Sequence, residues 1–145
     1  MNTLIYIALT LIMGVTMSVY LPMNSSVAKY VGSAITANIV FFIVALFTTI
    51  LIFGFLGEKE AIMKIGKIPP HLYLAGFISA FMILGTTFII PHLGARKFFI
   101  LLVTGQIVMA IVVSHFGALE SPLDPISLKK MLGATLVIMG AVIST

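Results

Sequence analysis

Long apolar runs separated by short polar segments are the main feature of this sequence. A helix needs roughly 20 apolar residues to cross the hydrocarbon core of a bilayer. Five such runs are present, and they predict helices over residues 2–29, 34–56, 71–90, 97–115 and 128–145. The sequence has no alternation of apolar and polar positions typical of strands and no solenoid-like repeat. The pattern predicts an all-α membrane protein, with a five-helix transmembrane bundle as a single domain over residues 1–145.

Proline and glycine mark the expected ends of these helices. Pro69 and Pro70 end the linker after the second run, and Pro70 can start the next helix. Pro91 and Gly94 are expected to close the third helix. No Lys or Arg precedes the first run and further apolar runs follow it, so we expect a retained helix there rather than a cleaved signal peptide.

The composition agrees with a chain that is covered by lipid. Hydrophobic residues make up 61% and charged residues 8% of the 145 positions, and the mean hydropathy is +1.25. Soluble domains carry about 45–50% apolar and about 25% charged residues. The net charge of +4 comes from scattered Lys and Arg, whereas nucleic-acid binding needs a clustered basic face. Cysteine is absent from the sequence, which excludes disulfides and thiol chemistry.

The basic residues give a weak indication of orientation. With five crossings, the two termini lie on opposite sides of the membrane. The N-terminal side carries Lys59, Lys64, Lys67, Lys129 and Lys130, and the other side carries Lys29, Arg96 and Lys97. Five against three favours an N-terminus on the inside. A bias this small is also compatible with insertion of the same chain in both orientations.

Asp, Glu, Lys and Arg are absent from the interior of all five runs. This excludes the simplest proton-coupled design, in which an intramembrane carboxylate binds proton and substrate in turn. Ser and Thr can bond to carbonyls of their own helix, so the amides are the more informative polar groups. Gln106, beside Gly105, either contacts a substrate or bonds to another helix. For Asn38, near the start of the second helix, a helix–helix contact is the favoured alternative.

The segment Tyr20-Leu21-Pro22-Met23-Asn24 is unusual for a membrane helix. Pro22 removes a backbone donor and crowds the carbonyl of Ser18, so a kink or unwinding is expected there. Transporters use broken helices to expose backbone groups to substrates, although an ordinary helix end would explain the segment too. His115, at the end of the fourth run, is either an interfacial residue or a proton-handling group. No metal site, cofactor site or catalytic triad is expected from the spacing of the titratable residues.

Several short motifs follow one another along the chain. They are Pro22-Met23-Asn24, Gly32-Ser33, Pro91-His92-Leu93-Gly94-Ala95, Gly105-Gln106, His115-Phe116-Gly117, Gly133 and Gly140. Taken in this order, they resemble the YdcZ-like family of five-helix bacterial membrane proteins, which are half-size relatives of the drug/metabolite transporter superfamily. The chain departs from the family pattern at Tyr20, where Gln is common, and at Ser114, where Asp is common.

The resemblance implies a bacterial inner-membrane transporter whose five helices form half of a ten-helix assembly. The resemblance implies that the second half is an identical chain in antiparallel orientation, a paired homologous chain or a fused repeat. The candidate substrate-binding residues are Gln106, Asn24, Tyr20, His115 and Asn38. The expected function is transport of a small organic molecule by an antiparallel dimer. The alternative is an accessory membrane protein that binds a partner and transports nothing.

A stripe of small residues on the last helix is a candidate dimer contact. Close packing drives helix association in bilayers, and small side chains permit it. The residues that recur at three-, four- and seven-residue spacing are Gly133, Ala134, Val137, Gly140, Ala141 and Ser144. The same stripe could instead pack against helices of its own chain.

Overall fold

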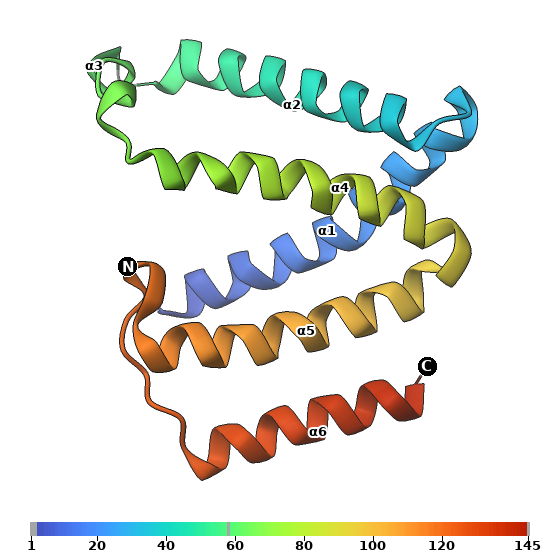
Figure 1. Cartoon of the computed structure of the whole chain (residues 1–145), viewed down its shortest axis with the longest axis vertical. Helices are drawn as coiled ribbons and strands as arrows, with labels where there is room; N and C mark the ends of the chain where they lie inside the picture. The colour runs from blue at the N-terminus through green and yellow to red at the C-terminus, as the bar shows by residue number, and fades with distance from the viewer. Residues whose placement is uncertain (1–2, 58, 145) are drawn as a thin grey trace. The chain divides into compact units, whose positions relative to one another are not determined.

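The computed structural model describes residues 3–57 and 59–144, which are almost entirely helical (Figure 1). The α-helices are α1 (Thr3–Val31), α2 (Ala34–Leu56), α3 (Lys59–Ile62), α4 (Leu74–Leu93), α5 (Ala95–Phe116) and α6 (Leu128–Ser144). Short 3-10 turns are η1 (Ile65–Lys67), η2 (Pro70–Tyr73) and η3 (Ala118–Glu120). The described residues contain no strand, so the predicted all-α class is confirmed.

The helices fall close to the predicted ranges, but they do not all qualify as membrane spans. The candidate spans among the described residues are Thr3–Val31, Ala34–Leu56, Pro70–Leu93 and Ala95–Phe116. The helix α6 has 17 residues, at the lower end of the range of about 17–25 that crosses a bilayer. The structure thus supports four spans, and the fifth crossing stays a prediction.

The chain divides into two units, Met1–His92 and Leu93–Thr145. In the first unit a tight turn joins α1 to α2 (Figure 1). Gly32 follows α1 with a φ of +72°, a left-handed conformation that glycine adopts readily. The Ser33 side chain accepts a hydrogen bond of 3.2 Å from the Thr36 amide and caps α2. Gly32 and Ser33 therefore reverse the chain within two residues.

Two prolines lie inside helices of the first unit. The helix α1 is continuous across Pro22, so the unwinding expected there is not seen. The helix α4 continues through Pro91 to Leu93, so the expectation that Pro91 closes the helix was wrong. A proline removes one backbone hydrogen bond but leaves the rest of the helical ladder in place. Gly94, with a φ of +81°, separates α4 from α5.

The second unit consists of α5 and α6, which lie side by side and are joined by a loop (Figure 1). Gly117 ends α5 in a left-handed conformation with a φ of +59°. Arg96, at the start of α5, donates a hydrogen bond of 2.8 Å from its Nη1 to the Ser144 carbonyl at the end of α6. A contact between the first turn of one helix and the last turn of the other shows that the pair is antiparallel.

Hydroxyl side chains within the helices mostly bond to their own backbone, as expected from the sequence. Each donates to a carbonyl four residues earlier, which satisfies the hydroxyl without a second helix. The residues with this bond include Thr10, Thr16, Ser18, Thr48, Thr49, Thr87, Thr104 and Thr135. These groups add little to helix–helix specificity, with Thr87 as an exception.

Candidate functional site

Asn24 forms a polar contact between α1 and α4. Its side chain is 6% exposed, and its Nδ2 donates a hydrogen bond of 2.7 Å to Thr87 Oγ1. A buried amide needs hydrogen-bond partners because leaving its groups unpaired in an apolar medium is costly. The contact therefore ties α1 to α4 in the apolar part of both helices.

Thr87 fixes the orientation of the Asn24 amide. The Thr87 hydroxyl donates to the Ile83 carbonyl at 2.7 Å, so its oxygen is left to accept the hydrogen bond from Asn24. The amide must then present its NH₂ group to Thr87 and its carbonyl oxygen elsewhere. Pro91, four residues after Thr87, has no N–H to give to the Thr87 carbonyl. The contact thus lies at an interruption of the α4 hydrogen-bond ladder.

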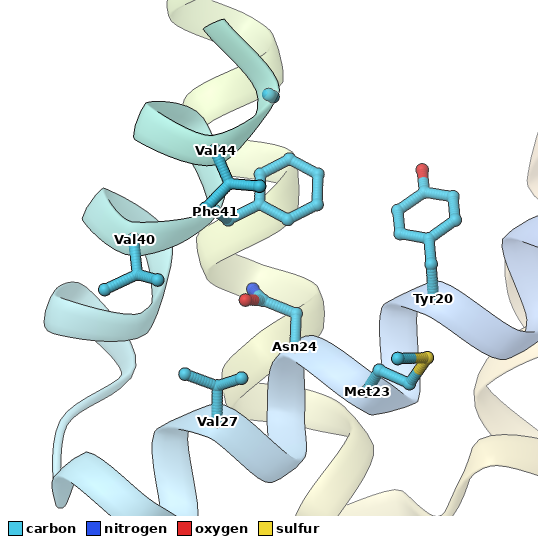
Figure 2. A pocket seen from close by; sticks show the side chains of 8 residues that line it. Tyr20, Met23, Asn24, Val27, Val40, Phe41 and Val44 are labelled. Atoms are coloured by element: carbon cyan, nitrogen blue, oxygen red, sulfur yellow. The ribbon is translucent and has the colours of Figure 1, made fainter. Parts of the chain in front are cut away.

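A hollow of about 350 Å³ lies between α1 and α2 beside this amide (Figure 2). Its lining residues are Tyr20, Met23, Asn24, Val27, Val40, Phe41, Val44 and Ala45. Figure 2 shows the Asn24 amide directed toward Val40 and Phe41 of α2. The volume is within the range of about 300–1,000 Å³ that is common for small-molecule sites.

Two aromatic rings form part of the wall of this hollow. The rings of Tyr20 and Phe41 are 6.0 Å apart between centroids, with an angle of 23° between their planes. Both side chains are half-buried. Such near-parallel pairs stabilise the contact between helices and offer flat apolar surface to a ligand.

The chemistry of the hollow is mainly apolar, with Asn24 Oδ1 as an open hydrogen-bond acceptor and the Tyr20 hydroxyl as a further polar group. None of the described residues donates a hydrogen bond to Asn24 Oδ1. Among the described residues, Asn38 Oδ1 is the fully buried side-chain oxygen without a partner. Asn24 Oδ1 also lacks a partner but does not belong to that group, so part of its surface is accessible. The lining carries no Asp, Glu, Lys, Arg or His. This arrangement can bind an uncharged molecule and accept one hydrogen bond from it.

Asn38, another predicted site residue, lies outside this hollow. Its Nδ2 donates a hydrogen bond of 3.2 Å to the Ala80 carbonyl of α4. Reversing the amide would place two oxygens against each other, so the orientation is determined. The contact agrees with the helix–helix alternative, and it leaves the Oδ1 atom buried without a partner.

Gln106 and His115, the other two candidates, belong to α5 in the second unit. The Gln106 side chain is exposed and has no hydrogen-bond partner among the described residues. A Cβ atom added at the neighbouring Gly105 would meet nothing within 4 Å. Gln106 therefore does not bond to α6, the other helix of its unit. That it shares a cavity with Tyr20 and Asn24 stays a prediction.

His115 binds the loop that follows α5. Its Nδ1 accepts a hydrogen bond of 3.2 Å from the Ile126 amide, so its Nε2 carries the proton in this contact. The Asp124 amide donates to the Ser114 carbonyl at 2.9 Å, and Lys130 Nζ pairs with Asp124 Oδ1. These contacts agree with the interfacial interpretation of His115, because its ring holds the loop against the end of the helix.

The stripe of small residues on α6 partly faces α5 of the same chain. A hollow of about 420 Å³ between the two helices is lined by Phe99, Ile100, Val103, Thr104, Val137, Gly140, Ala141 and Ser144. Four of the six stripe residues are in this group, whereas Gly133 and Ala134 are not. This favours packing within the chain for those four, and a dimer contact through the stripe stays a prediction.

Sequence reasoning missed Thr87 and Phe41. By sequence, Thr87 is one of several hydroxyls that can bond to their own helix, and in the structure it also accepts a hydrogen bond from Asn24. Its position four residues before a proline inside an apolar run is a signal that could have found it. Phe41 lies among other aromatic residues of α2, and nothing in the sequence distinguishes it from residues that face lipid.

Comparison with known proteins gives one family match. A family model described as "Putative inner membrane exporter, YdcZ" matches residues 5–143 of this chain. The matched range includes the whole lining of the hollow beside Asn24 and all five candidate site residues. Neither the curated proteins nor the solved structures gave a match.

Proposed function

Because the chain belongs to the YdcZ family of inner-membrane exporters, we propose that it exports a small organic solute as an antiparallel dimer. It is a multi-pass inner-membrane protein, and its family is one of transporters rather than enzymes. Each copy would contribute five crossings to a ten-helix assembly. The opposite orientation of the two copies would repeat a design common among transporters, in which inverted halves surround a central site.

The hollow beside Asn24 is the observation that carries this proposal. It combines a buried amide held from α4, an open acceptor oxygen and two aromatic rings. Polar groups within membrane helices are expensive and often mark substrate pathways. A protein that only anchored a partner would not need an open acceptor in an apolar hollow of this size.

Gln106 supports an assembly larger than one chain. An exposed amide in the apolar stretch of α5 loses hydrogen bonds to water without gaining any from the described residues. A solute or a second copy of the chain would supply the missing partner. In the proposed dimer, Gln106 lines the solute path near the contact between the copies, and His115 lies at one end of it.

A screen followed by flux measurements tests the transport proposal. Purified protein is screened for small organic molecules that raise its unfolding temperature, since a ligand stabilises the state that binds it. Each hit is then measured for flux in proteoliposomes. Asn24→Leu should abolish flux of the hit, and Ser26→Ala, on the exposed side of α1, should leave it unchanged. Stabilising ligands without flux would favour the alternative of an accessory protein.

Cysteine labelling tests the antiparallel arrangement, since the sequence has no cysteine of its own. Tyr30 is 91% exposed near the end of α1, and Lys64 is exposed in the linker before α4. With both orientations in one membrane, Tyr30→Cys and Lys64→Cys are each labelled in part by an impermeant reagent from outside. Complete labelling at one position and none at the other would show a single orientation.

A change at Gly140 tests the dimer contact through α6. A Cβ atom at Gly140 would meet nothing within 4 Å inside the chain. If the stripe contacts a second copy, Gly140→Leu should give a monomer that is still inserted, as measured by cross-linking or mass photometry. Leu136→Ala, at a residue that is 68% exposed, is the control. A Gly140→Leu protein that remains dimeric and active would place the contact elsewhere.

A further inference from the structure

The Asn24 amide can take only one orientation, and this has a consequence for the ligand. Thr87 Oγ1 gives its proton to the Ile83 carbonyl and receives the Asn24 N–H. Thr87 is 1% exposed, so the pair is enclosed between the helices and shielded from competing water. A free asparagine can offer either its N–H or its oxygen to a ligand. Because its N–H is bonded to Thr87, Asn24 presents its carbonyl oxygen to a ligand in the hollow.

The wall of the hollow limits the rest of the ligand. The rings of Tyr20 and Phe41 form a near-parallel aromatic pair, against which a flat ring packs better than a branched chain. Met23 adds a flexible thioether that adapts to irregular shapes. The eight lining residues carry no ionisable group other than the Tyr20 phenol. A charged ligand would therefore lose its hydration without meeting an opposite charge.

We propose, on the basis of the proposed export function, that this hollow selects an uncharged, flat, aromatic solute that donates one hydrogen bond to Asn24 Oδ1. Thr87 is the positioning residue for this selection. It does not line the hollow, and it acts through the Asn24 amide. Phe41 and Tyr20 bind the ring, and Asn24 distinguishes ligands with a donor from those without one.

A matched pair of probes tests the proposal. The probes are 2-naphthol, which has one O–H donor, and 2-methoxynaphthalene, which has the same rings and no donor. Their dissociation constants are measured on the full-length protein in detergent, with empty micelles as the reference for partitioning. The wild-type protein should bind 2-naphthol about tenfold more tightly, which corresponds to one net hydrogen bond. Equal affinities would overturn the proposal.

Variants separate positioning from packing. Thr87→Val keeps the shape of the side chain and removes the acceptor for the Asn24 N–H, which frees the amide to donate to the ether oxygen of 2-methoxynaphthalene. The tenfold preference should therefore fall to about one, because 2-methoxynaphthalene binds more tightly. Asn24→Leu should give the same loss of preference. If Thr87→Val keeps the tenfold preference, Thr87 has only a structural role and that part of the proposal is wrong.

A change in the aromatic wall gives a second, independent measurement should Asn24→Leu fail to fold. Phe41→Leu should weaken both probes by a similar factor and leave their ratio near ten. Phe42→Leu is the matched control, because Phe42 lies next in sequence but lines a different hollow. If Phe41→Leu leaves both affinities unchanged, the aromatic solute does not bind in this hollow.

The experiments distinguish a failure of this ligand proposal from a failure of the export proposal. If neither probe binds but a solute of another class is carried across proteoliposomes, the ligand class is wrong and export stands. If both probes bind with the expected ratio but no solute is carried, the hollow is a ligand site and export is wrong.

Discussion

The two units of this chain differ in where their polar side chains find hydrogen-bond partners. In the first unit, amides in the apolar part of the helices join one helix to another, as Asn24 does with Thr87 and Asn38 with Ala80. In the second unit, the described side-chain hydrogen bonds that join one segment to another lie at the helix ends, around Arg96 and His115. The amide of the second unit within an apolar stretch, Gln106, is exposed without a described partner.

This difference indicates what each unit needs from outside the chain. A membrane helix gains little from apolar contact with another helix because lipid is equally apolar, so hydrogen bonds and close packing decide how helices pair. The first unit meets this need internally and retains one open acceptor at Asn24. The second unit has an amide without a partner inside that unit, and we propose that a solute or another chain supplies it. The following changes test that distinction.

Among the following changes, Gln106→Leu should have the largest effect. Because the change replaces an amide without a described partner in an apolar stretch by an apolar side chain, the free energy of unfolding should stay the same or rise slightly. Flux of an identified solute should fall about tenfold, the loss expected for one hydrogen bond. Met109→Leu, at an exposed position of the same helix, is the control. Unchanged flux in a Gln106→Leu protein would mean that this amide lies outside the solute path.

His115→Ala should lower stability by about 1 kcal/mol, because the Ile126 amide loses its acceptor. Thermal unfolding in detergent measures the change. His115→Asn can place an oxygen near the former Nδ1 position and should restore part of the loss. His71→Ala, at an exposed histidine of the first unit, serves as the control. A fall in flux with normal stability would show that His115 acts on the solute path rather than on the loop.

Asn38→Leu should raise stability slightly, by about 0.5 kcal/mol. The change removes one interhelical hydrogen bond, worth about 0.6 kcal/mol on average in membranes. It also removes a buried oxygen without a partner, whose burial costs about 1–3 kcal/mol. Unfolding in detergent would give the sign. An Asn38→Leu protein that is clearly less stable than the wild type would mean that Asn38 Oδ1 has a partner in the assembled protein.

Lys130→Met should have the smallest effect, below about 0.5 kcal/mol. The side chains of Lys130 and Asp124 are 33% and 64% exposed, and exposed ion pairs contribute about 0–1 kcal/mol that salt screens further. The hydrogen bond of 2.7 Å from Lys130 Nζ to the Pro125 carbonyl is lost as well. Lys129→Met is the matched control. Equal unfolding curves in low and high salt would show that the ion pair does not stabilise the loop.

The sequence predicted the helices well but only part of the site. Apolar run length can be read along the chain, and for this reason the ranges of α2 and α5 were close to those found. The contact between Asn24 and Thr87 joins residues 63 positions apart, and no local pattern indicates which hydroxyl will meet the amide. The helices also continue past Pro22 and Pro91, because the surrounding hydrogen bonds outweigh the one that each proline removes.

The unequal lengths of the helices make the chain sensitive to bilayer thickness. With a rise of about 1.5 Å per residue, the 29 residues of α1 extend about 44 Å and the 17 residues of α6 about 26 Å. A hydrocarbon core of about 30 Å is too thin for the first helix and too thick for the last. Tilting accommodates α1, whereas α6, if it makes the predicted fifth crossing, would need local thinning of the lipid, snorkelling side chains or association with another helix. Lipids with shorter acyl chains therefore relieve the mismatch at α6 and increase it at α1.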